Sequence, residues 1–100
     1  MSVLITVKFQ GNTDTFRHAL ADRADEFVKV SDASRAVGAI HHRFAVGDDF
    51  VLVFDEWDSF EHFEQFFSNP DLHAFIGSVG ADPAPPEITV AEAVASPDQF

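Results

Sequence analysis

The chain has 100 residues, the size of one domain, and 46% of them are hydrophobic, which is enough for a single core. Seventeen acidic residues against six basic ones give a formal net charge of −11, which argues against binding to nucleic acid or to anionic membrane surfaces. The absence of cysteine excludes disulfides and thiolate chemistry. We therefore expect one cytoplasmic domain over residues 1–95, followed by a C-terminal tail at residues 96–100.

Hydrophobic periodicity predicts the first half of the fold. Apolar and polar side chains alternate over residues 3–9, as in a β-strand. Asn12 or Thr13 can then cap an amphipathic helix of about four to five turns, whose last apolar positions are Phe27 and Val28. A polar turn is expected at residues 31–35, and alternation resumes in a strand over residues 37–46.

The second half repeats this pattern with a more apolar strand. The short turn Gly47-Asp48-Asp49 predicts a hairpin to a strand over residues 50–57 that is apolar on both faces. Asp58 or Ser59 can cap a second helix, which Asn69-Pro70 interrupts and which continues to about residue 76. A stiff loop at residues 81–86 leads to a last strand over residues 87–94.

The predicted order βαββαβ is that of the ferredoxin-like α+β fold, an antiparallel sheet with both helices on one face. The other face of the sheet would then expose Leu4, or Val51 and Val53. Apolar patches of this kind usually mark an interface. We therefore predict a homodimer in which two sheets pack together.

The segment DEWDSFEHFEQFFSNPDLHAF, taken with the fold order and the length, resembles the antibiotic biosynthesis monooxygenase-like family of dimeric α/β barrels. The shared residues are Glu56, Trp57, Ser59, Glu61, Phe63, Pro70 and Phe75. This resemblance implies pairing of two chains into a dimeric α/β barrel. It also implies a choice of function, because the family contains cofactor-free oxygenases of quinol-like substrates, haem-degrading enzymes and members without known activity.

The polar residues of the family do not all have counterparts in this chain. Many members carry a histidine on the second helix nine residues after the tryptophan, where this chain has Phe66. The haem-degrading branch uses a late axial histidine and an asparagine on the first strand, and the matching positions here are Phe75 and Val7. We therefore expect no haem and no other cofactor.

Of the five histidines, His42 is the candidate general base. It shares a strand face with Ile40 and Phe44, so it can lie in a cavity under the helices. A neutral imidazole there could take the proton of a phenolic hydroxyl. The alternative is a histidine that is simply satisfied by a hydrogen bond, or one at the dimer interface.

The remaining polar candidates have simpler interpretations. His41 points to the opposite face from His42, and helical periodicity places His18, His62 and His73 in solvent, so no metal site is expected. On the face that holds His41, an Arg43–Asp55 cross-strand pair is plausible.

Aromatic residues are the candidate walls of a pocket. Four phenylalanines lie within eight residues of the second helix, more than one core stripe needs, so at least one should face a cavity or a partner chain. Trp57 could stack on an aromatic ligand, although packing at the end of a central strand would equally explain it. The expected substrate-binding residues are Trp57, Phe66, Phe63, Phe44 and Val7.

Besides a purely structural dimer with a filled interior, these observations leave two classes of function open. In the first, the homodimer binds a small hydrophobic or aromatic molecule and acts as a cofactor-independent monooxygenase of an aromatic or quinone-like compound, with His42 as the base. In the second, the same pocket belongs to a non-catalytic ligand carrier or accessory protein.

Overall fold

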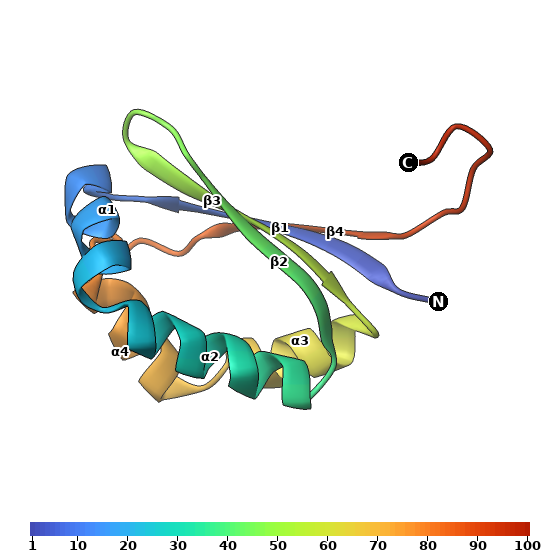
Figure 1. Cartoon of the computed structure of the whole chain (residues 1–100), viewed down its shortest axis with the longest axis horizontal. Helices are drawn as coiled ribbons and strands as arrows, with labels where there is room; N and C mark the ends of the chain where they lie inside the picture. The colour runs from blue at the N-terminus through green and yellow to red at the C-terminus, as the bar shows by residue number, and fades with distance from the viewer.

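The computed structural model describes residues 1–100 as four antiparallel strands with four helices on one face of the sheet (Figure 1). The sheet has the order β2-β3-β1-β4, so the first and third strands are central. This confirms the predicted ferredoxin-like fold. In chain order the elements are β1 (Val3–Gln10), α1 (Thr13–Asp22), α2 (Ala24–Ala36), β2 (Ala39–Val46), β3 (Phe50–Trp57), α3 (Phe60–Phe67), α4 (Pro70–Ser78) and β4 (Glu87–Glu92).

Each predicted helix is a pair of helices. The first breaks at Arg23, whose backbone leaves the helical region at φ −122° and ψ 31°. The predicted polar turn at residues 31–35 is wrong, because α2 continues through it to Ala36. The Ser34 hydroxyl donates to the Ser31 carbonyl within this helix, which satisfies a polar group that periodicity alone places in a loop. The turn comes later, at Gly38, whose φ of +128° favours glycine.

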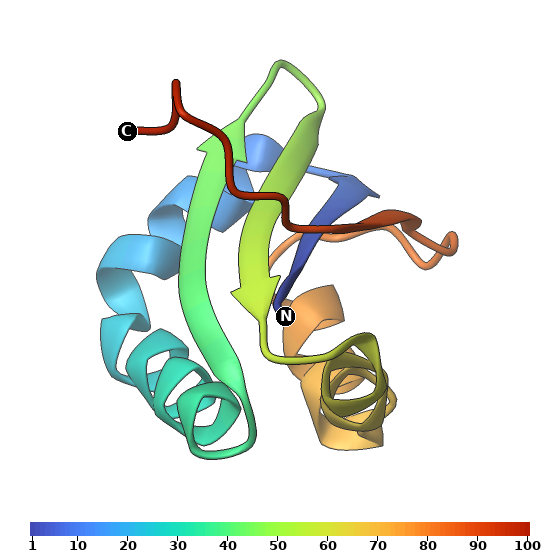
Figure 2. The same cartoon turned by 90° about the vertical axis from the view of Figure 1, so that its right-hand side faces the viewer.

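Side-chain caps fix where the other helices begin. Asn12 accepts from the backbone N–H of Thr15, and Ser59 accepts from that of His62. Asn69 caps α4, whose first residue is Pro70, as the sequence predicted. Figure 2 shows that both helix pairs lie on the same face of the sheet, with α1–α2 at the left of the view and α3–α4 at the right.

The core lies between this face and the helices. Ile5, Val7 and Trp57 are each 1% exposed and form its centre, where they pack with Val53 and Phe63. The prediction that Val51 and Val53 lie on the uncovered face is therefore wrong, since both are buried beneath the helices. Leu4 is on the uncovered face as predicted and is 50% exposed, and Phe54 from β3 is 46% exposed.

The uncovered face follows from the strand register. Leu4 pairs with Glu56, Thr6 with Phe54 and Lys8 with Leu52, so these six side chains lie on the uncovered face.

None of the helices is both long enough and apolar enough to cross a membrane.

Candidate active site

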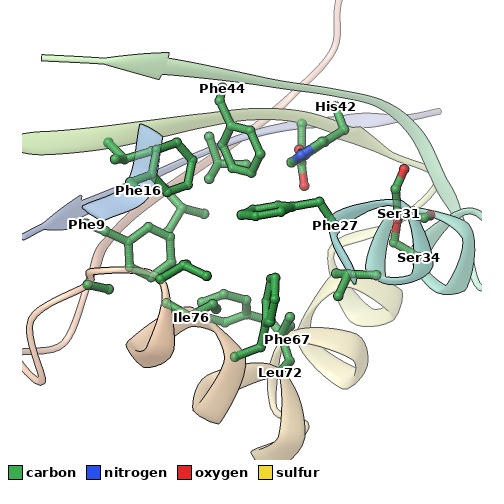
Figure 3. A pocket seen from close by; sticks show the side chains of 18 of the residues that line it. Phe9, Phe16, Phe27, Ser31, Ser34, His42, Phe44, Phe67, Leu72 and Ile76 are labelled. Carbon is green, nitrogen blue, oxygen red and sulfur yellow. Dashed lines mark hydrogen bonds and ion pairs between the residues drawn. The ribbon is translucent and has the colours of Figure 1, made fainter. Parts of the chain in front are cut away.

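A cavity of about 320 Å³ lies between the sheet and the helices. All four helices and the strands β1, β2 and β3 contribute to its wall, and 18 of its 26 lining residues are hydrophobic. Apolar pockets with a few convergent polar groups are the usual form of small-molecule sites. The cavity has this form, with mainly apolar walls and a few polar side chains (Figure 3).

Phenylalanine rings make up much of the wall. Phe16, Phe27 and Phe44 meet edge to face, with ring centroids 5.0 to 6.0 Å apart. On the α3 side, Phe63 stacks on Phe67 at 5.2 Å. These edge-to-face and stacked contacts fix the rings relative to one another, so the wall is built largely of ordered aromatic surface.

His42 supplies a ring nitrogen to this apolar space. It comes from β2, its side chain is 36% exposed, and its ring meets the Phe44 ring edge to face at 4.6 Å. Its Nδ1 lies 2.6 Å from Oδ1 of Asp55. An ionised carboxylate only accepts hydrogen bonds, so a neutral imidazole paired with it would carry its proton on Nδ1 and keep Nε2 as an acceptor. His42 therefore has the form a general base needs.

Asp55 is the site residue that sequence reasoning placed on the wrong face. Its side chain is 11% exposed and it lines the cavity together with His42. Its second oxygen, Oδ2, accepts from Nε1 of Trp57 at 3.0 Å. The predicted Arg43–Asp55 pair is wrong, because Arg43 lies opposite Phe54 and His42 lies opposite Asp55.

The hairpin register explains this error. Val46 pairs with Val51, so even-numbered residues of β2 share a face with odd-numbered residues of β3. The predicted Arg43–Asp55 pair assumed instead that odd-numbered residues of both strands share a face. A three-residue turn at Gly47-Asp48-Asp49 would pair residues of like parity, whereas the Gly47 N–H donates to the Phe50 carbonyl, so only Asp48 and Asp49 form the loop and Asp55 comes to lie beside His42.

The other histidines lie away from the cavity. His41 is 75% exposed on the opposite face, where its Nδ1 lies 2.9 Å from Glu56, and the Ser2 hydroxyl donates to the same carboxylate at 2.5 Å. These hydrogen bonds, first that of Ser2 and then that of His41, hold the pKa of Glu56 below its ordinary value. His62 bonds to Asp58 in solvent.

No group of three or more histidine, aspartate or glutamate side chains lies close enough together to hold a metal ion. The predicted binding residues Val7, Phe44, Trp57, Phe63 and Phe66 all line the cavity. Their role in binding stays a prediction. Phe60, the fourth phenylalanine of its group, is 39% exposed and lies outside the wall.

Comparison with known proteins shows that several solved structures share the fold of this chain. No protein-family model matches the chain, and no curated protein matches it. Several solved structures do match over nearly their whole length. SnoaB, a cofactor-independent oxygenase from Streptomyces nogalater, shares 11% identity with a TM-score of 0.64 and 98% of each chain covered.

Two further structures match as well. The ActVA-Orf6 monooxygenase of Streptomyces coelicolor, solved in complex with nanaomycin D, shares 18% identity with a TM-score of 0.64, covering 95% of this chain and 89% of its own. A dimeric ferredoxin-like protein from an uncultured marine organism shares 12% identity with a TM-score of 0.63, covering 99% and 93%. The resemblance to antibiotic biosynthesis monooxygenase-like proteins is thus confirmed at the level of the fold.

Proposed function

We propose that the protein is a homodimeric small-molecule-binding protein that acts as a cofactor-independent monooxygenase on an aromatic phenol or quinone-like compound. The observation that carries this proposal is the position of His42, bonded through Nδ1 to Asp55, in the wall of a mainly apolar cavity. The fold shared with SnoaB and ActVA-Orf6, described as an oxygenase and a monooxygenase, supports the same reaction type.

The proposed reaction needs no reductant beyond its substrate. His42 takes the hydroxyl proton of a phenol whose para ring carbon carries hydrogen, which places negative charge on that carbon. Molecular oxygen adds there, and the resulting hydroperoxide loses water to give the quinone. One oxygen atom enters the product and the other leaves in water, so atoms and electrons balance.

The apolar wall assists this chemistry in two ways. Phe27, Phe44 and Phe67 line the cavity with apolar surface, and a bound aromatic ring that displaced water there would strengthen electrostatic interactions and protect the carbanion from reprotonation. Flat walls also hold an aromatic ring in one orientation relative to His42, and positioning of this kind can lower a barrier by several kcal/mol, on the order of 7.

The uncovered sheet face supports the homodimer. Leu4 and Phe54 present apolar surface there, as a sheet-to-sheet interface requires. Lys8 lies over the Phe50 ring on the same face, and Glu56 provides charge of the opposite sign. Cations and carboxylates on one patch can pair with each other across a two-fold axis, because such an interface is self-complementary.

A ligand carrier is the second candidate. Phe66 lines the cavity at the position where many members of the resembled family have a histidine, so the cavity holds fewer polar groups than such a site would. A carrier would use the same phenylalanine walls without any role for the Nε2 of His42. The two functions therefore differ in turnover and not in binding.

Oxygen consumption with a panel of naphthols and hydroxylated anthrones tests the proposal. The wild type should consume oxygen above the uncatalysed rate, and His42→Ala should lower this rate by about 10²- to 10⁴-fold. His41→Ala is the matched control, since it removes the neighbouring histidine from the opposite face. Equal rates for the wild type and His42→Ala would contradict the assignment, and tight binding without turnover would favour the carrier.

A further inference from the structure

We propose that Asp55 and Trp57 are positioning residues that hold His42 in its Nδ1–H tautomer, with Nε2 directed at the bound ligand. The kinetic part of this proposal rests on the proposed function, whereas the tautomer is a property of the resting protein.

With the Asp55 carboxylate ionised, the chain of hydrogen bonds can be arranged in one way only. The indole Nε1–H of Trp57 is a donor without acceptor capacity, and it lies 3.0 Å from Oδ2 of Asp55. The other carboxylate oxygen of Asp55, Oδ1, lies 2.6 Å from Nδ1 of His42. With one oxygen taken by the indole, the remaining oxygen accepts the Nδ1 proton, and the orientation of the imidazole is set.

Burial separates this arrangement from an ordinary surface pair. Trp57 is 1% exposed and Asp55 is 11% exposed, so both are held by packing. On the other face of the same two strands, His41 and Glu56 also pair through Nδ1, but their side chains are 75% and 25% exposed. The exposed pair has no indole donor, and it therefore provides an internal comparison.

The surroundings contain no competing charge. Among the residues that line the cavity, Asp55 and His42 are the only ones with titratable side chains, and those from β1 and from all four helices are uncharged. When His42 takes a proton from the ligand, the Asp55 carboxylate is the group that stabilises the imidazolium. A carboxylate in an apolar setting acts more strongly than one in water.

Nitrogen NMR of the histidine ring tests the tautomer directly. We would label the full-length protein with ¹⁵N-histidine, record spectra near pH 8.5, about two units above the ordinary histidine pKa, and assign His42 by its loss in His42→Phe. The expected result is a protonated Nδ1 and an unprotonated Nε2 at His42. A protonated Nε2 in the wild type would overturn the proposal, whether or not any substrate is turned over.

Asp55→Asn makes a sharper prediction because of Trp57. The indole N–H must still be accepted, so the carbonyl oxygen of the introduced asparagine turns to Trp57 and its amide NH₂ turns to Nδ1 of His42. The tautomer should therefore invert, with the proton on Nε2. Adding Trp57→Phe frees the amide to rotate, and the Nδ1–H tautomer should return in the double variant.

Kinetics then connect the tautomer to function. Asp55→Asn should lower kcat by about 10²- to 10⁴-fold with a smaller change in KM, and the added Trp57→Phe should restore part of the loss. Glu56→Gln, which alters the pair on the opposite face, should leave the His42 spectrum unchanged. An inverted tautomer with unchanged kcat would show that the proposed role in catalysis is wrong while the positioning itself stands. An Asp55→Asn spectrum identical to that of the wild type would refute positioning.

Discussion

Replacement of Trp57 by phenylalanine should destabilise the protein by about 2–4 kcal/mol. The substitution removes the indole N–H that donates to Asp55, and an unsatisfied oxygen on a side chain only 11% exposed costs about 1–3 kcal/mol. The smaller ring also leaves roughly 40 Å³ unfilled beside Phe63 and Phe66, which adds about 1 kcal/mol at ~24 cal/mol per Å³.

Thermal and urea unfolding followed by far-ultraviolet circular dichroism measure this loss at a fixed protein concentration. For a 100-residue domain, the midpoint temperature should fall by about 10–25 °C. A double-mutant cycle with Asp55→Ala separates the two contributions, and we expect a coupling free energy of about 1–2 kcal/mol. A coupling energy near zero would refute the idea that the indole and the carboxylate stabilise each other.

Three further predictions concern other parts of the molecule. Phe54→Glu should weaken self-association at least about tenfold in sedimentation equilibrium, because it places a charge on the uncovered face. The control Asp25→Asn on α2 should leave self-association unchanged, and a wild type that stays monomeric at micromolar concentration would contradict the interface. Glu56→Gln should lower stability at pH 7, because a lowered carboxyl pKa contributes stability that is fully present above the ordinary value of 4.5; this deficit should shrink as the pH falls from 4.5 through the lowered pKa of Glu56. A deficit that is undiminished at pH 3 in urea titrations would show that the pairing with Ser2 is unimportant. Haem should cause no stoichiometric shift of its Soret band, since Phe75 and Val7 line the cavity where the haem-degrading branch has polar residues, and submicromolar binding would disprove this.

The strand and helix order could be predicted because local patterns dictate it. Alternation in residues 3–9, the Asn69-Pro70 break and the Gly47-Asp48-Asp49 turn each act over a few residues. The break at Arg23 could not be predicted in this way. Its side chain bonds to Glu26 three residues further on and to Ser78 at the end of α4, and the second of these contacts joins residues far apart in the sequence.

The candidate site shows the same division between local and long-range information. Strand alternation placed His42 under the helices, and aromatic clustering placed Phe63 and Phe66 on the cavity wall. Asp55 was missed because its face depends on the register between two strands, and a shift of one residue reverses every side chain. The partner of the candidate base thus required the structure.

Isotope labelling with ¹⁸O₂ tests the central claim most directly. The wild type would be mixed with a naphthol that has hydrogen at its para carbon, and the quinone would be examined at once by mass spectrometry. The account predicts one labelled oxygen atom per quinone, formed with one molecule of oxygen consumed, and little product beyond the uncatalysed amount with His42→Ala. Label incorporated by His42→Ala at the wild-type rate would contradict the account.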